Sequence, residues 1–221
     1  MADDPSRTGA RPVVPPELQH LRETCLESTD AWRGNLLHIR QDRVVTPDGT
    51  RSTREYVVHP GAVMVIPLLG EGADLRVVLE RQFRYPLQRV MIEFPAGKRD
   101  RGEDLLHCAR RELREETGYR AREWAHAGVL HPLIAYSDEF IDIWFARGLT
   151  PGGRDLDPGE TLDVFTARPD ELMAWCRSGA VTDGKTLSAT LWLQNVLSGQ
   201  WTLDWVADPS DAAGTDRAPA G

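Results

Sequence analysis

The sequence predicts an α+β protein in which a mixed β-sheet packs between helices, preceded by a small antiparallel β unit. Apolar strand-like segments and amphipathic helices follow one another without the regular strand–helix alternation of a doubly wound parallel sheet. Before residue 59 the chain holds only short strand-like segments around a turn, and such a unit buries little surface by itself. With 221 residues, the chain is long enough for one or two domains with a substantial core.

The N-terminal β unit is predicted to span residues 16–58. Residues 16–28 place apolar side chains at helical spacing and predict a short helix. The tripeptide Pro47-Asp48-Gly49 is a turn signal between strand-like segments. These segments are residues 36–39, 43–45 and 54–58. Because the unit has little to bury, we expect it to lean on the main domain or on a partner chain.

The main domain is predicted to span residues 59–207, and its first two strands are joined by a hairpin-type connection at residues 70–73. Strands are predicted at residues 62–69, 75–83, 127–130, 140–146 and 162–165. Helices are predicted at residues 104–117, 169–177 and 185–197. Outside both domains, residues 1–15 and 208–221 have compositions that predict disordered tails.

The helix predicted from Asp104 to Thr117 carries the chemistry. Its segment contains no proline or glycine, and Gly118 follows where a left-handed helix end is expected. Apolar residues recur every four positions, at Leu105, Ala109 and Leu113. At about 100° per residue, Glu112 and Glu116 lie on the face that Leu105 and Ala109 begin. We therefore expect both carboxylates to point toward the protein body.

This arrangement of acids is electrostatically unfavourable. Glu112, Glu115 and Glu116 repel one another across one helical turn and lie at the negative end of the helix dipole. One interpretation is a solvated acidic helix whose arginines form ion pairs, with Arg111 and Glu115 at the right spacing. However, the acidic face coincides with the apolar face, which a solvated helix would avoid. A hard divalent cation with oxygen ligands, Mg²⁺ or Mn²⁺, would remove the repulsion.

The residues around this helix resemble the Nudix box at every defined position. The matching pattern is Gly97, five residues, Glu103, seven residues, then Arg111-Glu112-Leu113-x-Glu115-Glu116-x-Gly118-Tyr119. The resemblance implies a Nudix-type α/β/α sandwich and a Mg²⁺-dependent hydrolase, for which Mn²⁺ is a substitute. It implies that Glu112, Glu116 and the Ala96 carbonyl bind metal, with Glu115 in the same cluster. Arg111 and Glu103, with Gly97 and Gly118, would shape the loop and helix.

Segments outside the box resemble the ADP-ribose pyrophosphatase branch of this family. They are residues 54–63, 81–85, 93–97, 137–139 and 183–186. This branch implies cleavage of ADP-ribose to AMP and ribose 5-phosphate by a homodimer, in which the N-terminal strands of one subunit complete the other's substrate site. GDP-mannose or another nucleotide sugar is the alternative substrate. Pro132 lacks the glycine that usually follows it in this branch, so the sequence leaves substrate selection open.

A carboxylate must accept the proton of the attacking water. Glu160 is the first candidate for this general base, because the preceding glycine allows its loop to close over substrate. Glu115 and Glu139 are the alternatives. The opposing interpretation is that Glu160 is an ordinary exposed loop residue.

Five further residues are expected to contact the substrate. Arg84 suits a bidentate phosphate clamp, although a strand-end ion pair is the alternative. By family analogy, Arg51 and Arg54 would reach the phosphates of the neighbouring subunit. Trp32 is a candidate for stacking on adenine, and Glu93 is expected near the metal cluster.

Composition excludes several other classes of function. The net charge is −8 and no basic stripe is visible, so we expect no nucleic-acid partner. No apolar run approaches the roughly 20 residues of a membrane span, and no signal peptide is visible. Three cysteines without paired or metal-type spacing fit a cytoplasmic protein. A Nudix-fold nucleotide sensor is the non-enzymatic alternative, but such a module tends to lose box carboxylates and this chain keeps them all.

Overall fold

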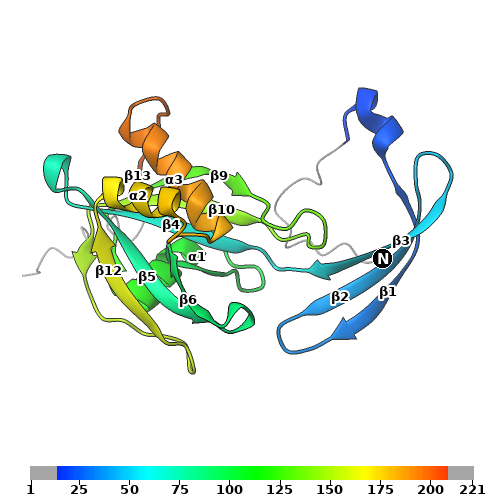
Figure 1. The fold of residues 1–221 in the computed structure, drawn as a ribbon, viewed down its shortest axis with the longest axis horizontal. Helices are drawn as coiled ribbons and strands as arrows, with labels where there is room; N and C mark the ends of the chain where they lie inside the picture. The colour runs from blue at the N-terminus through cyan, green and yellow to red at the C-terminus, as the bar shows by residue number, and fades with distance from the viewer. Residues whose placement is uncertain (1–13, 209–221) are drawn as a thin grey trace, which may run out of the picture. The chain divides into compact units, whose positions relative to one another are not determined.

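The computed structural model describes residues 14–208, so the predicted tails lie, apart from their innermost residues, outside the described part of the chain. The chain forms two compact units (Figure 1). The first unit runs to Pro60 and includes Leu133–Phe140. The second unit consists of Gly61–Pro132 and the residues from Ile141 onward.

The first unit is a three-stranded antiparallel sheet in the order β1-β2-β3. Its elements are the 3₁₀ turn η1 (Pro16–Leu21) and the strands β1 (Thr24–Arg33), β2 (His38–Val45) and β3 (Arg51–Val58). The helix predicted over residues 16–28 is wrong beyond Leu21, because Thr24 onward pairs with β2 from Val45 backward. Cross-strand pairing overrides the weak helical spacing of this segment.

The predicted turn at Pro47-Asp48-Gly49 connects β2 and β3. Asp48 accepts hydrogen bonds from the Thr46 hydroxyl at 2.6 Å and the Thr50 N–H at 3.0 Å. Gly49 adopts a φ of 86°, which a side chain would oppose. Leu133–Phe140 runs back along β3, where the Asp138 carboxylate accepts the His59 N–H at 2.8 Å.

The second unit is built on an eight-stranded sheet. The main path is β12-β5-β4-β10-β9-β13, with β6 beside β5 and β7 beside β4. The strands are β4 (Ala62–Leu69), β5 (Arg76–Arg84), β6 (Arg89–Glu93), β7 (Ala96–Lys98), β9 (Glu123–Leu130), β10 (Ile141–Arg147), β12 (Leu162–Ala167) and β13 (Val206–Ala207). A separate pair is formed by β8 (Tyr119–Arg120) and β11 (Thr150–Pro151). The 3₁₀ turns are η2 (Gly72–Asp74) and η3 (Tyr85–Leu87). Only β4 and β10 pair in parallel, so the sheet is mixed as predicted.

Helices cover both faces of this sheet (Figure 1). They are α1 (Leu105–Glu112), α2 (Pro169–Ser178) and α3 (Gly184–Leu197). Side chains along β4 alternate between two cores. Val63 and Val65 belong to the core with Ala109 of α1. Met64 and Ile66 belong to the core that α2 and α3 close. The structure therefore confirms the predicted α+β sandwich with a separate N-terminal sheet.

Candidate active site

The helix predicted at residues 104–117 forms in two parts. Asp104 caps α1 by accepting the His107 N–H at 3.0 Å. After Glu112 the chain continues as a π-helical segment, η4 (Leu113–Thr117), and ends at Gly118 with a φ of 77°. Such widened turns are frequent at functional sites. Glu112 and Glu116 are only 8% and 3% exposed, so the expected inward direction of both side chains is observed.

Arg111 forms hydrogen bonds with three acidic residues of the box. It donates two hydrogen bonds to Glu103, at 2.9 and 3.0 Å, one to Glu112 at 2.8 Å and one to Glu115 at 3.1 Å. The hydrogen bond from Arg111 lowers the pKa of Glu103 to about 2. The second oxygen of Glu115 accepts from Arg114 at 2.6 Å. Glu115 is thus held between two arginines, as the ion-pair interpretation predicts.

Gly97 allows the β7 backbone to approach the helix. A Cβ atom at this position would lie 2.0 Å from the Glu112 carboxylate, so a larger residue would displace that carboxylate. The N–H of the preceding residue, Ala96, donates a hydrogen bond to Glu116 Oε2 at 3.0 Å. The strand therefore places the Ala96 peptide beside the two carboxylates that the box places inside the protein.

Both inward carboxylates resist ionisation in this environment. Burial raises the pKa of Glu112 to about 7, against the opposing effect of Arg111. Burial also raises the pKa of Glu116 well above its ordinary value, and the charges of Glu80, Glu112 and Glu160 add to the rise. The positive charges in the described part of the chain are thus too few or too distant to keep the pKa values of Glu112 and Glu116 at their ordinary level.

Glu160 belongs to the same group of acids. It lies on the loop before β12, and its Oε1 accepts a hydrogen bond from Gln82 of β5 at 3.1 Å. Its charge raises the pKa of both Glu112 and Glu116. Glu160 therefore interacts electrostatically with the two inward carboxylates of the box, and its role as general base stays a prediction.

The predicted phosphate clamp, Arg84, binds the predicted metal-cluster residue Glu93. Two parallel hydrogen bonds of 2.7 Å join the Arg84 guanidinium to the Glu93 carboxylate, which is 2% exposed. Lys185 also donates to Glu93 and binds Asp183 at 2.9 Å. Burial opposes the ionisation of Glu93, but Arg84 and Lys185 outweigh it and lower its pKa. The structure shows the ion pair that was the alternative for Arg84, and the phosphate clamp stays a prediction.

The donor set fits a divalent cation. Glu80 of β5 is fully buried, and neither carboxylate oxygen has a hydrogen-bond partner among residues 14–208. Oxygen donors with uncompensated charge are the ligands that Mg²⁺ and Mn²⁺ prefer. In the same residues, no three His, Cys, Asp or Glu side chains already converge as a metal-ligand group. Arg111 occupies an oxygen of Glu112, and the Ala96 N–H occupies one of Glu116, so both carboxylates would have to exchange a partner for the ion.

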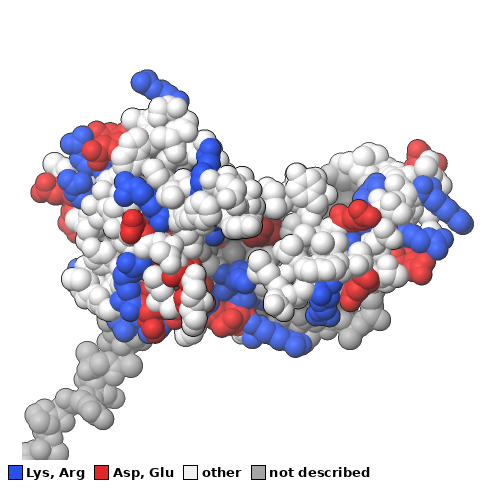
Figure 2. Space-filling view, turned by 60° about the horizontal axis from the view of Figure 1, so that its bottom comes forward, with Lys and Arg blue, Asp and Glu red and all other residues white. Residues whose placement is uncertain are grey.

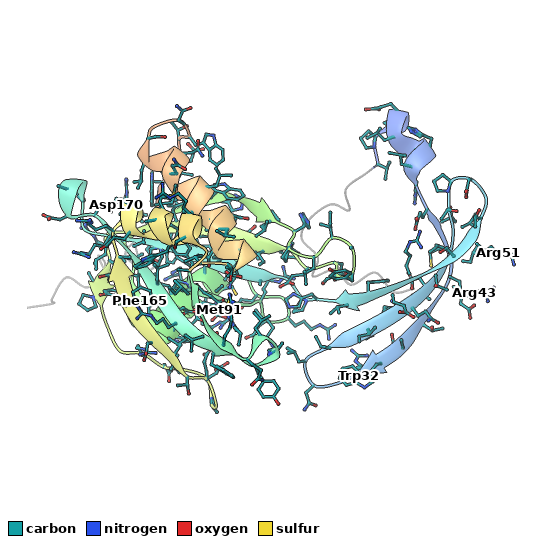
Figure 3. The ribbon with its side chains drawn as sticks, in the orientation of Figure 1. Trp32, Arg43, Arg51, Met91, Phe165 and Asp170 are labelled. Atoms are coloured by element: carbon teal, nitrogen blue, oxygen red, sulfur yellow. The ribbon has the colours of Figure 1, made fainter. Side chains whose placement is uncertain are left out.

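The remaining predicted residues belong to the first unit. Trp32 and Arg51 lie toward opposite ends of its sheet (Figure 3). Trp32 is 53% exposed and lies over Gly34, where an added Cβ would be 2.1 Å from the indole ring. Arg54 binds Glu23 through two hydrogen bonds. Glu139 lies 3.9 Å from His59. Within this unit, the structure does not gather these residues into one site.

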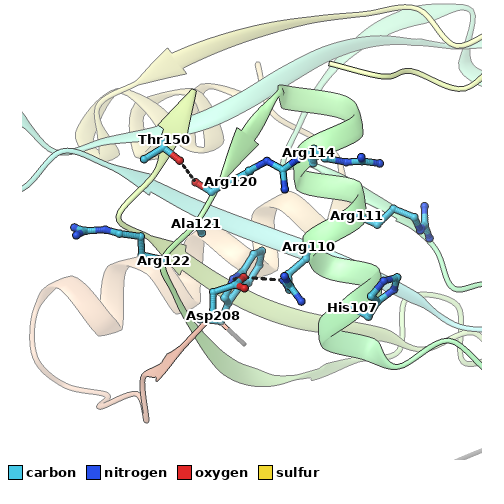
Figure 4. Close-up of a pocket in the computed structure, with 10 residues that line it drawn as sticks. His107, Arg110, Arg111, Arg114, Arg120, Ala121, Arg122, Thr150 and Asp208 are labelled. Atoms are coloured by element: carbon cyan, nitrogen blue, oxygen red, sulfur yellow. Dashed lines mark hydrogen bonds and ion pairs between the residues drawn. The ribbon is translucent and has the colours of Figure 1, made fainter. Parts of the chain in front are cut away.

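A basic pocket lies on the other side of α1 (Figure 4). Its cavity volume is about 350 Å³, and its lining includes Arg110, Arg111, Arg114, Arg120, Arg122 and Asp208. Arg110 and Arg114 project opposite to Glu112 and Glu116, because two helical positions differ by about 200°. Asp208 pairs with Arg110 at 2.7 Å and accepts from Trp124 at 3.0 Å. We assign the pocket to the attachment of the C-terminal strand rather than to the carboxylate site.

Charges elsewhere are mixed. Basic and acidic side chains are interspersed over the visible face in Figure 2, and neither sign forms a continuous band there. No helix in the described part of the chain combines the length and hydropathy that a membrane span needs.

Sequence reasoning missed Glu80, Gln82 and Lys185 as parts of the site. Glu80 had a detectable signal, since it is a charged residue directly after Val77-Val78-Leu79 in an apolar strand. A charge at a buried strand position indicates either a partner or a function. Gln82 had no such signal, because its contact with Glu160 spans 78 positions of sequence.

Comparison with known proteins identifies the family of this chain. The model of the Nudix domain matches residues 58–188, and that of the nucleoside diphosphate sugar hydrolase N-terminal domain matches residues 23–57. An ADP-ribose pyrophosphatase of Bacillus subtilis is 32% identical over 179 residues, covering 80% of this chain and 95% of that protein. A methanol dehydrogenase activator of Bacillus methanolicus is 35% identical over 176 residues, covering 78% and 92%.

A solved structure gives the same fold. The crystal structure of an ADP compounds hydrolase superposes with a TM-score of 0.72 at 24% identity, covering 81% of this chain and 96% of that one. The chain therefore belongs to the Nudix family of hydrolases, and the resemblance seen in the box residues is confirmed. Enzymes of this family generally use divalent metal ions.

Proposed function

We propose that this Nudix hydrolase cleaves the diphosphate bond of ADP-ribose to give AMP and ribose 5-phosphate, with Mg²⁺ as cofactor and Mn²⁺ as a substitute. The observation that carries this proposal is the pair of buried carboxylates, Glu112 and Glu116, whose pKa values are raised by burial and further by the charge of Glu160. Relatives named ADP-ribose pyrophosphatase support the choice of substrate, and they include the Bacillus subtilis protein and one from Mycobacterium tuberculosis at 35% identity.

Glu112, Glu116 and the Ala96 carbonyl would hold the cation. When bound, the cation supplies positive charge to the phosphate oxygens and lowers the pKa of water. Glu160 accepts the proton of the attacking water. The water oxygen forms a bond to one phosphorus, the bond from that phosphorus to the bridging oxygen breaks, and the bridging oxygen leaves on the other phosphate. Gln82 keeps the Glu160 carboxylate in place through its 3.1 Å hydrogen bond.

Arg84 would position the diphosphate. Its hydrogen bonds to Glu93 use two of the five guanidinium N–H groups, which leaves donors for phosphate oxygens on the same planar group. The ion pair with Glu93 fixes the direction of the guanidinium, and this preorganisation favours binding.

The first unit would act across a dimer. Val44 is the only buried hydrophobic residue in its described part, whereas Leu26, Trp32 and Leu36 are more than half exposed. A sheet with this much apolar surface gains stability against a partner. We therefore keep the homodimer as a proposal, with Trp32, Arg51 and Arg54 contributing to the substrate site of a second copy. A light-scattering mass near that of one 24.7 kDa chain would contradict it.

Product analysis tests the reaction. Purified protein with Mg²⁺ is given ADP-ribose, GDP-mannose and other ADP compounds in parallel, and nucleotide products are separated by chromatography. We expect AMP and ribose 5-phosphate, formed fastest from ADP-ribose. Faster turnover of GDP-mannose would replace the substrate, whereas binding without product would support the sensor alternative. Labelled water then shows which phosphorus is attacked, according to whether AMP or ribose 5-phosphate carries the label.

Glu160→Gln tests the general base. Glutamine keeps the size of the side chain but has no carboxylate to accept a proton, so turnover should fall by roughly 10²-fold or more. The matched control is Asp157→Asn, which changes an acid whose backbone carbonyl binds Glu160 in the same loop. Wild-type turnover by Glu160→Gln would transfer the role to Glu115 or Glu139.

A further inference from the structure

Glu80 is an unusual residue for its position. It follows Val77, Val78 and Leu79 in β5, all of them 0% exposed, and is itself 0% exposed. Neither of its carboxylate oxygens has a hydrogen-bond partner among residues 14–208. An apolar side chain would suit such a strand, because burying a carboxylate without a partner costs several kcal/mol. The carboxylate of Glu80 therefore destabilises the fold and needs another explanation.

The strand register points Glu80 toward the carboxylate site. Side chains two residues apart share a face of the sheet, so Glu80, Gln82 and Arg84 project together. Gln82 binds Glu160, and Arg84 binds Glu93. Glu93 is also the direct cross-strand partner of Glu80, which places both side chains on this face.

Glu80 does not gain a counter-charge of its own from this arrangement. Arg84 and Lys185 both direct their hydrogen bonds to Glu93. Like charges directly across two strands are destabilising, so Glu93 adds to the cost of an ionised Glu80. The face that carries Glu80 also carries Gln82, which reaches Glu160, and after burial the charge of Glu80 is the main cause of the raised pKa of Glu116.

We propose that Glu80 is a ligand of the divalent-cation centre that lies outside the box helix and shares an ion with Glu116. This proposal rests on the metal-dependent function proposed above. A cation between the two carboxylates would give Glu80 a partner of opposite charge. Both carboxylates would be attracted to the ion, which offsets the repulsion between them. The centre then draws ligands from the helix and from the sheet, which fixes the ion relative to Gln82 and Glu160.

The test is metal binding rather than activity. Mn²⁺ is titrated into metal-free protein, and the free ion is followed by electron paramagnetic resonance. Glu80→Gln is nearly isosteric, and we expect it to bind Mn²⁺ at least tenfold more weakly than the wild type. Glu80→Asp keeps a carboxylate on a shorter side chain, so its affinity should fall between the two. Glu123→Gln removes an exposed carboxylate of β9 and should bind as the wild type does.

Two further outcomes separate the proposals. Wild-type Mn²⁺ affinity and stoichiometry in Glu80→Gln would show that Glu80 is a neutral packing residue, and would overturn this inference while leaving the proposed reaction intact. Failure of the wild type itself to bind Mn²⁺ would overturn the metal-dependent function, and this inference with it.

Discussion

Glu80 and Glu93 are neighbours in the sheet, but their surroundings shift their pKa values in opposite directions. They are direct cross-strand partners, and both are almost completely buried. Glu93 receives two hydrogen bonds from Arg84 and one from Lys185, and its pKa is lowered. Glu80 receives none among residues 14–208, and burial together with the charge of Glu93 raises its pKa to about 8. Burial alone therefore does not decide the state of a carboxylate here.

The same contrast recurs around Arg111. Glu103 accepts two of its hydrogen bonds and has a pKa of about 2, whereas Glu112 accepts one, is more strongly affected by burial, and has a pKa of about 7. The compensated acids, Glu93 and Glu103, hold the structure together. In the acids we call uncompensated, Glu80, Glu112 and Glu116, burial outweighs the partners that are present, so their pKa values are raised and a proton or a cation stabilises them. Each prediction below tests this division.

The largest effect is expected from the double variant Glu112→Gln and Glu116→Gln. It keeps the shape of the helix face but removes both charges that would hold the cation. Charge stabilisation by a metal is worth several kcal/mol, so turnover of ADP-ribose with Mg²⁺ should fall by roughly 10³-fold or more. Steady-state kinetics at saturating Mg²⁺ measures it.

The control for this variant removes the same number of charges from the surface. Asp170→Asn with Glu123→Gln changes two exposed carboxylates of the same unit, and turnover should stay near that of the wild type. If the Glu112/Glu116 variant cleaves every tested nucleotide at full speed, the uncompensated acids have no role in the chemistry.

A smaller effect, on stability, is expected from Glu93→Gln. Removing this charge leaves Lys185 without its buried partner and weakens both hydrogen bonds from Arg84. Breaking a buried pair typically costs 3–5 kcal/mol, and the 39% exposure of Arg84 allows water to recover part of it. We therefore expect a loss of about 2 kcal/mol in the free energy of unfolding, measured by urea denaturation.

Glu123→Gln is the matched control for that loss. Glu123 and Arg147 form the same two-bond geometry, at 2.9 and 3.0 Å, but the two side chains are 40% and 43% exposed. Arg147 also lies 4.0 Å from the ring of Trp205, so its guanidinium keeps a contact. Surface pairs contribute about 0–1 kcal/mol. Equal losses in Glu93→Gln and Glu123→Gln would show that burial does not distinguish the two pairs.

The sequence predicted those parts of the molecule that depend on local pattern. Strand β4 was predicted with its observed bounds, Ala62–Leu69, because it is a continuous apolar run. The end of the box helix was predicted because Gly118 has the backbone freedom that its φ of 77° requires. The inward direction of Glu112 and Glu116 followed from helical spacing alone.

What the sequence could not give is set by contacts between distant segments. Strand β6 (Arg89–Glu93) was missed, because its short, mixed sequence becomes a strand only by pairing with β5. The partnership of Lys185 with Glu93 joins positions 92 residues apart. No local pattern could show that Arg84 would be directed to Glu93, or that Glu80 would be left without a hydrogen bond in the described part of the chain.

The smallest expected effect is a pH dependence of the metal-free protein, and it separates the two classes of acid by sign. The raised pKa values of Glu80, about 8, and Glu112, about 7, mean that the folded protein keeps protons that the unfolded chain loses above about pH 4.5. The unfolded state then binds fewer protons, so stability falls as pH rises from 5 to 8.

The lowered pKa of Glu103 acts below this window, because its contribution is lost only as pH falls toward about 2. With a chelator present, we expect the free energy of unfolding to fall between pH 5 and pH 8, measured by urea denaturation at each pH. Saturating Mg²⁺ should reverse it, because a cation binds the ionised carboxylates. Glu80→Gln should flatten the metal-free profile. Because all histidines are present in both proteins, the difference between the two curves reports Glu80 together with the effect of its charge on Glu116. A wild-type profile that is level or rises over this range would mean that the buried acids are already compensated.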